Sequence, residues 1–277
     1  MGYKDIGINR VSIGAQTFSN ELLRFLGRRH SAAEIFKAYK NSRKAGFENV
    51  NIDLLMGFPG QTMETWLKSL TETLALDPEH ITTTNWYTKY KGSERFLERA
   101  KNGGKKIADR TFRIKLFRFA SNLLEKHGYR RYIYFNFALP GKEYCYETDF
   151  FSAIDNVISF GPGPYSNLNG KIVVSRANIK AYLENPTQIK VELPIRVRDF
   201  IKHNLYRPQG VSRRRFEREF QLTLEEGIQE HPYAQNLVNQ LMEQSLIVLD
   251  EKGLRFKPGS DIEGLISMVE FQDSWNG

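Results

Sequence analysis

Two successive strand-turn-helix patterns between residues 7 and 62 constrain the fold more than any other part of the chain. The first is a short apolar strand over 11–15 that ends at polar Gln16 and is followed by leucines at helical spacing. The second is an alternating strand over 50–55, a glycine-proline turn and a helix over 66–76. Parallel strands need a crossover connection, and a helix supplies it. The pattern therefore predicts an α/β fold with a parallel sheet.

A third strand, predicted over 80–87, extends the same rhythm. In parallel α/β sheets and barrels, functional groups collect at the carboxyl ends of the strands. Gln16, Asp53 and residues 85–87 lie at or near such ends. We expect them to face one site.

Asp53 has the strongest independent case as a site residue. It lies inside a strand between Ile52 and Leu54, where burial of a carboxylate costs free energy unless a partner compensates. A buried structural ion pair is the alternative to a ligand-binding role. The cation of Arg28 is one candidate partner.

Several spaced motifs then occur in a fixed order: GINRVSIGAQTF, LGRRH at 26–30, AGFENVNIDLLMGFPGQT at 45–62 and LDPEHIT at 76–82. Together they resemble the radical S-adenosylmethionine (radical SAM) enzymes of the oxygen-independent coproporphyrinogen III oxidase type. A weaker similarity extends over 128–141 and 158–166 and into the C-terminal region. The resemblance implies a partial (β/α) barrel, made of the distal strands of the radical SAM barrel.

The resemblance also implies cofactors. Members of the family hold a [4Fe-4S] cluster with a C-x-x-x-C-x-x-C loop upstream of these motifs. The chain has one cysteine, Cys145, which lies too late to belong to that loop and is expected to be a spectator thiol. One cysteine cannot supply the thiolates of a cluster. We therefore expect a C-terminal portion of such an enzyme, with a partial S-adenosylmethionine site and no cluster site.

The family motifs assign ligand roles to individual residues. Gln16 is implied to bind the methionine moiety or ribose of S-adenosylmethionine, and Arg28, twelve residues later, its carboxylate. Asp53 would accept from the ribose hydroxyls. Tyr87 and Tyr165 complete the predicted cofactor-binding set. Without the resemblance, Gln16 would simply end a strand, Arg28 would lie on a solvated helix face, and the glycine-rich turn around Tyr165 would only shape a loop.

The remaining patterns predict a helix over 108–127, a single strand over 129–139 and a short strand over 155–160. Gly57, Pro59 and Gly60 are interpreted as a tight turn rather than a phosphate cradle, because no Gly-Lys-Ser/Thr follows. A break at Asn185-Pro186 ends this region.

From about residue 190 the pattern changes to three helices, over 196–206, 212–220 and 231–246, and a hairpin that turns over 250–253. This arrangement resembles the winged-helix-like appendage that the family carries after its barrel. We predict two domains: 1–189, the distal part of the barrel with a family-specific extension, and 190–277, the winged-helix-like domain.

The charge is unevenly distributed. The chain carries a net charge of +8, but residues 190–277 hold 12 Lys and Arg against 14 Asp and Glu. The positive surplus therefore belongs to 1–189 and suits an anionic small molecule, whereas the C-terminal domain is poorly suited to a phosphate backbone.

No apolar run approaches the ~18 residues of a membrane span. With one cysteine, no internal disulfide can form, and a cytoplasmic location is expected.

The predicted function is that of the C-terminal portion of a coproporphyrinogen-III-oxidase-like radical SAM protein. Complete members generate a 5′-deoxyadenosyl radical that acts on a tetrapyrrole or another aromatic substrate. The KEYCYETDFF segment at 142–151 replaces the motif of the family's haem chaperones, which disfavours haem trafficking. The alternatives are a radical SAM C-methyltransferase or cyclopropanase fragment, and a non-enzymatic binding module that uses the winged-helix-like domain on a protein or nucleic acid.

Overall fold

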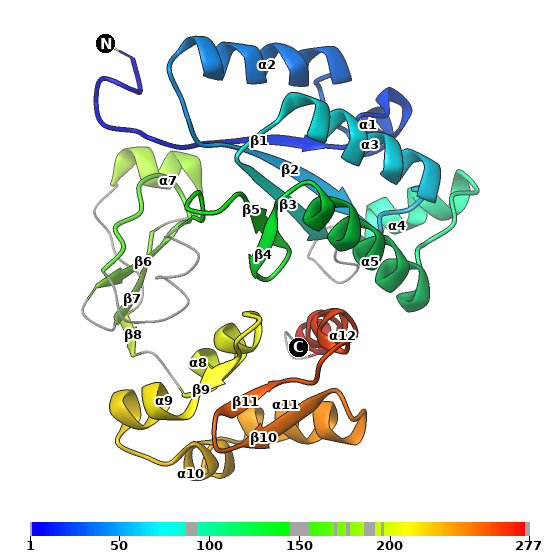
Figure 1. The fold of residues 1–277 in the computed structure, drawn as a ribbon. Coiled ribbons are helices and arrows are strands. Elements are labelled where there is room, and N and C mark those ends of the chain that lie inside the picture. Colours follow the sequence, from blue (N-terminus) through cyan, green and yellow to red (C-terminus); the bar gives the residue numbers. More distant parts are fainter. Residues whose placement is uncertain are drawn as a thin grey trace. The chain divides into compact units, whose positions relative to one another are not determined.

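The structure is a computed structural model, and it describes residues 2–86, 93–144, 156–168, 171–175, 178–185, 192–194 and 197–274. Contacts divide the chain into two compact units (Figure 1). Unit 1 comprises Met1–Glu143 with Leu265–Gly277, and unit 2 comprises Tyr144–Gly264. The domain boundary at 189/190 stays a prediction. None of the helices in the described ranges is long and apolar enough to cross a membrane.

Unit 1 contains a five-stranded mixed sheet in the order β1-β2-β3-β5-β4. The strands β1, β2 and β3 are parallel, whereas β5 runs antiparallel to β3 and to β4. The α/β fold class with parallel strands is thereby confirmed. The strand bounds are β1 Val11–Gln16, β2 Val50–Met56, β3 His80–Asn85, β4 Arg130–Ile133 and β5 Asn136–Ala138.

Helices cover one face of this sheet (Figure 1). On that face Ile52, Leu54 and Met56 of β2 are fully buried. Trp66 is also fully buried and donates from its indole Nε1 to the Leu116 carbonyl at 3.0 Å, which ties α3 to α5. The helix bounds in unit 1 are α1 Asn20–Phe25, α2 Ala32–Lys44, α3 Met63–Leu76, α4 Ser93–Asn102 and α5 Arg110–Lys126.

Two helices connect β1 to β2, where the sequence predicted one helix that carried Arg28. Gly27 has a left-handed φ of 72° and follows the end of α1, because glycine adopts this conformation without steric cost. A new helix starts after Ser31, whose backbone N–H and hydroxyl both donate to Glu34. Arg28 therefore lies in the turn between α1 and α2, and its placement on a helix was wrong.

The single strand predicted over 129–139 is instead a hairpin. Tyr134 has φ 50°, so the chain reverses between β4 and β5. The alternation of apolar and polar residues is the same for one strand as for a tight hairpin, which is why the sequence pattern did not reveal the turn. The strand predicted to reach Phe160 is also wrong within 156–160, where Val157 forms only an isolated bridge. Asp155 lies outside the described residues.

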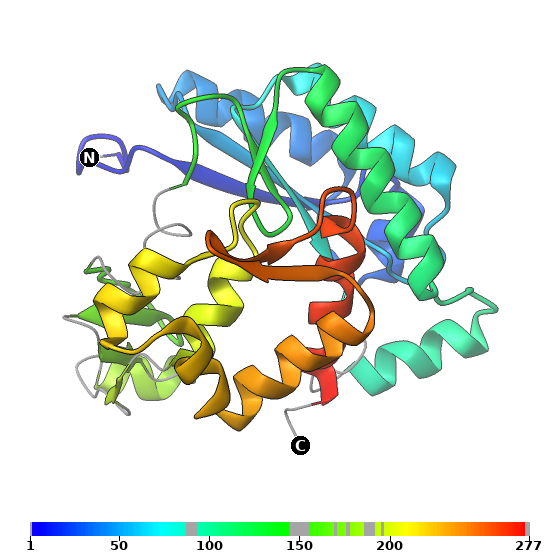
Figure 2. The ribbon, with the colours of Figure 1, turned by 60° about the horizontal axis from the view of Figure 1, so that its bottom comes forward.

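Unit 2 contains two three-stranded antiparallel sheets, ordered β6-β7-β8 and β10-β11-β9. The first sheet was not predicted. The second contains the predicted hairpin, in which Asp250 pairs with Gly253, and contacts helices α8 and α11 (Figure 2). The bounds are β6 Tyr165–Leu168, β7 Lys171–Val174, α7 Ile179–Glu184, β8 Glu192–Pro194, α8 Val197–Leu205, β9 Val211–Ser212, α9 Arg213–Phe220, α10 Leu224–Gln229, α11 Pro232–Glu243, β10 Ile247–Asp250 and β11 Gly253–Phe256. A final helix, α12 (Asp261–Ser274), crosses the boundary between the units.

Candidate functional site

The face of the unit 1 sheet opposite the buried Ile52 and Leu54 is polar. On β2 this face presents Asn51 and Asp53, because successive side chains of a strand point to opposite faces. On β3 it presents His80 and Thr82, which pair in register with Asn51 and Asp53. These side chains define a polar cluster around Asp53.

Asn51 lies at the centre of this cluster and is 2% exposed. Its Nδ2 donates to Asp53 Oδ1 at 2.6 Å and to Ser12 Oγ at 3.0 Å. Its Oδ1 lies 2.7 Å from His80 Nδ1 and accepts from the Thr82 hydroxyl at 3.2 Å. The other ring nitrogen of His80, Nε2, lies 2.7 Å from the Tyr132 hydroxyl. Asn51 therefore links four side chains.

The charge of Asp53 is not neutralised by direct contact with a cation of the described residues. Among the described residues, no ion pair involves Asp53. Burial raises the pKa of its carboxyl, and the hydrogen bond from Asn51, the nearby Thr82 hydroxyl and the charge of Arg10 oppose that rise. Because the folded-state pKa is raised, the ionised carboxylate lowers stability above that pKa, and the loss vanishes below the unfolded-state pKa. The structural ion pair that was the alternative is therefore not present among the described residues.

Gln16 ends β1 next to this cluster. It pairs with Leu54, the neighbour of Asp53, after a register shift that follows Ile13. Its φ of 65° is left-handed, which costs a non-glycine residue about 1–3 kcal/mol and is frequent at binding sites. Irregularities of this kind re-aim a side chain. The structure therefore places Gln16 and Asp53 on adjacent strands.

Arg28 is not brought to Asp53 by any hydrogen bond or ion pair that the structure records. It lies on the loop after α1, is exposed, and its backbone N–H donates to the Leu23 carbonyl at 2.9 Å. An exposed guanidinium at this position can bind a carboxylate only if the ligand extends to it. The role of Arg28 remains a prediction.

The structure does not test the roles of the two predicted tyrosines. Tyr87 lies outside the described residues, as does Cys145. Tyr165 is the first residue of β6 in unit 2, and its backbone pairs with Val174. Their roles in cofactor binding stay predictions.

The sequence pointed to the stretch 85–87 as a strand end. Within it, the structure identifies Asn85, the last residue of β3, as a buried polar group. It is 1% exposed, and neither Oδ1 nor Nδ2 of its amide has a hydrogen-bond partner among the residues that the structure describes. A Cβ at Gly57 would lie 3.3 Å from its Oδ1. Buried amides without partners cost free energy and require an explanation, such as a bound molecule or water.

Replacing Asn85 by leucine, which has a similar size, is expected to raise the free energy of unfolding by about 1–2 kcal/mol. The substitution removes two unsatisfied polar atoms from a buried position and breaks no recorded hydrogen bond. Urea denaturation of the two proteins measures the effect. A loss of stability would show that the amide is satisfied in solution.

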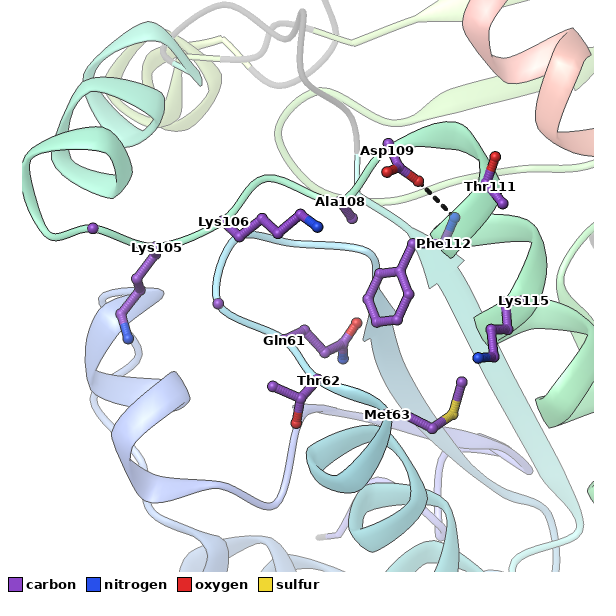
Figure 3. Close-up of a pocket in the computed structure, with 12 residues that line it drawn as sticks. Gln61, Thr62, Met63, Lys105, Lys106, Ala108, Asp109, Thr111, Phe112 and Lys115 are labelled. Atoms are coloured by element: carbon purple, nitrogen blue, oxygen red, sulfur yellow. Dashed lines mark hydrogen bonds between the residues drawn. The ribbon is translucent and has the colours of Figure 1, made fainter.

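A cavity of about 680 Å³ lies beside the loop after β2, the segment before α5 and the first turns of α5 (Figure 3). In this view the amines of Lys106 and Lys115 point toward the Phe112 ring from two sides. Lys105 instead pairs with Glu21 at 2.9 Å. None of the residues of the polar cluster lines this cavity, so it is a separate, positively charged hollow.

The turn that borders the cavity does not form a phosphate cradle. The N–H of Gly57 donates to Gln61 Oε1 at 2.6 Å, and the N–H of Gly60 donates to the Lys106 carbonyl at 3.0 Å. Both groups are therefore already bonded. Both glycines have a left-handed φ, as a tight turn requires.

Comparisons with known proteins agree with this geometry. The model of the Radical SAM superfamily matches residues 2–72, which include β1, β2 and their connection. The heme chaperone HemW of Bacillus subtilis (strain 168) is 27% identical over 232 residues, which are 80% of this chain and 60% of the relative. The oxygen-independent coproporphyrinogen-III oxidase-like protein HemZ of the same organism is 31% identical over 172 residues, or 57% of this chain and 33% of that protein.

The fold has a solved counterpart. The structure of coproporphyrinogen III oxidase (HemN) from Escherichia coli, described as a radical SAM enzyme, superimposes with a TM-score of 0.71 and 18% identity. The match covers 97% of this chain and 65% of that one. The chain thus spans about two thirds or less of the relatives it matches. The match of residues 2–72 to the Radical SAM superfamily and the similarity to HemW and HemZ support a HemN-like radical SAM family member.

Proposed function

We propose that unit 1 binds S-adenosylmethionine along the polar face of its sheet and serves a HemN-like radical SAM protein. The observation that carries the proposal is Asp53, a largely buried carboxylate with no ion pair among the described residues. A carboxylate kept in this position at a cost in stability is typical of a binding site. It lies within the matched region 2–72.

The chemistry of the donor set suits this ligand. Asp53 accepts hydrogen bonds from the ribose hydroxyls, and the Gln16 amide, which has no recorded partner in the described ranges, binds the methionine moiety or ribose. Arg28 meets the methionine carboxylate at the exposed end of the ligand. The cofactor-binding roles of Tyr87 and Tyr165 stay predictions from the family motifs alone. When bound, the cofactor supplies the activated adenosyl group that radical SAM proteins use.

The residues of this chain do not suit a [4Fe-4S] cluster. The sequence has a single cysteine. No group of three or more His, Cys, Asp or Glu that could hold a metal occurs in the described ranges. We therefore derive no step through a cluster, although radical SAM proteins generally bind one.

The substrate class that we propose is an anionic tetrapyrrole. The relatives in question are named heme chaperone and coproporphyrinogen III oxidase, and the positive surplus of residues 1–189 suits such an anion. A second candidate is haem binding without oxidation. It is favoured by two relatives named heme chaperone HemW, which match 80% and 90% of this chain.

The site predicts a loss of affinity for S-adenosylmethionine when its ligands are truncated. Asp53→Ala and Arg28→Ala are each expected to weaken binding to the 277-residue chain by about 1–3 kcal/mol, the range for one charge-assisted hydrogen bond. Isothermal titration calorimetry measures the change. The matched control is Arg29→Ala, which removes a neighbouring exposed cation. Equal losses in Arg28→Ala and Arg29→Ala would remove Arg28 from the site, and unchanged binding in Asp53→Ala would refute the proposal.

A further inference from the structure

The hydrogen bonds of the polar cluster have a direction that can be deduced. An ionised carboxylate only accepts, so the atom of Asn51 that faces Asp53 at 2.6 Å must be the donor Nδ2. The Oδ1 of Asn51 then faces His80 and can only accept. The His80 Nδ1 must therefore carry the proton and donate.

The state of His80 follows from its surroundings. Its side chain is almost fully buried, at 1% exposure, and burial, with a smaller effect of Arg10, lowers its pKa to about 3. The ring is thus neutral near pH 7 and carries one proton, on Nδ1. The unprotonated Nε2 can only accept, so the hydrogen bond of 2.7 Å to Tyr132 has the tyrosine hydroxyl as its donor.

The backbone of β4 supports a specific role for Tyr132. The register of β4 against β5 shifts between Arg131 and Ile133, so Tyr132 is the irregular residue of this strand. Such irregularities re-aim a side chain. The Tyr132 and His80 rings meet edge to face with centroids 5.5 Å apart.

We propose that Tyr132, His80 and Asn51 are positioning residues, and that they form a directed hydrogen-bond chain that fixes the carboxylate of Asp53. The chain runs from the Tyr132 hydroxyl through the His80 ring and the Asn51 amide to Asp53 Oδ1. Successive hydrogen bonds of this kind strengthen one another. One carboxylate oxygen is thereby held, and Oδ2 remains to accept from a ligand. The inference rests on the proposed function only where it concerns that ligand.

The test compares two tyrosine-to-phenylalanine variants of the 277-residue chain. Tyr132→Phe removes the hydroxyl that is the first donor of the hydrogen-bond chain. Tyr129→Phe removes a buried hydroxyl that donates to the Pro78 carbonyl at 2.5 Å and lies outside this hydrogen-bond chain. Carbon-13 NMR of labelled aspartate follows the titration of Asp53, and nitrogen-15 NMR reports the protonated nitrogen of His80.

In the wild type, we expect the nitrogen-15 spectrum to show His80 protonated on Nδ1 at pH 7. Tyr132→Phe should raise the pKa of Asp53 further, because the donors that stabilise its charge become weaker, whereas Tyr129→Phe should leave it unchanged. Arg10, the charged group whose field reaches both Asp53 and His80, is the same in all three proteins. A proton on Nε2, or equal titration of Asp53 in both variants, would overturn the proposal.

Affinity for S-adenosylmethionine separates this inference from the proposed function. We expect Tyr132→Phe to weaken binding roughly twofold, since each bond in such a chain is strengthened by 10–30%, and Tyr129→Phe to leave it unchanged. If Asp53→Ala weakens binding but Tyr132→Phe changes neither binding nor titration, the positioning chain is wrong and the cofactor site stands. If the titrations change as expected but no variant changes the affinity for S-adenosylmethionine, the hydrogen-bond chain stands and the proposed function is wrong.

Discussion

Replacing Asn51 by leucine is expected to lower the free energy of unfolding by about 3 kcal/mol. Leucine is close to asparagine in size, so little of this loss comes from a cavity. The loss comes from the partners. His80 is 1% exposed, and without Asn51 Oδ1 one of its ring nitrogens is left without a partner in either neutral tautomer. Asp53 also loses its 2.6 Å donor.

The matched control is the same substitution at Asn85. Both asparagines are buried, at 2% and 1% exposure, and both lie on neighbouring strands of one sheet. Within the described part of the chain, the side-chain amide of Asn51 has hydrogen-bond partners and that of Asn85 has none, so the two variants should change stability in opposite directions. Amide hydrogen exchange of β2 under native conditions reports the stability of unit 1. Equal effects would mean that burial alone, and not the hydrogen bonds, decides the cost.

Truncation of Trp66 to alanine should destabilise unit 1 by about 4 kcal/mol, within the range for a large buried aromatic residue. The side chain is fully buried between α3 and the rest of the helical layer. Its indole N–H also donates to the Leu116 carbonyl of α5 at 3.0 Å, so the variant loses packing and the hydrogen bond that joins two helices. Hydrogen exchange of α3 and α5 measures the effect.

Trp66→Phe separates the two contributions. Phenylalanine keeps most of the apolar volume but has no N–H, so we expect a smaller loss of about 1–2 kcal/mol. If both variants lost the same amount, the hydrogen bond to Leu116 would dominate, and the packing explanation would be wrong.

The sequence predicted the parallel part of the sheet because apolar alternation and helical spacing are local signals. The strands over 11–15 and 50–55 and the start of the strand at His80 are confirmed by β1, β2 and β3. It missed the reversal at Tyr134 because hairpin and strand share a period of two. It also missed the separate helix α2, which depends on the left-handed Gly27 and the Ser31–Glu34 cap.

Asp53 was identified from sequence alone because a carboxylate between apolar strand residues is costly wherever the strand packs. What the sequence could not provide is the set of partners. His80 and Tyr132 lie 27 and 79 positions further along the chain. They reach Asn51 only because β3 pairs in register with β2, and because β5 pairs with both β3 and β4.

The sequence by itself therefore determined the fold class, the motifs of the family and the residue that carries the charge of the site. Tertiary structure decided which groups surround that charge: a buried network around Asn51, with Arg28 exposed on a separate loop. The reason is physical. Strand periodicity acts over a few residues, whereas hydrogen-bond partners and desolvation depend on which strands become neighbours.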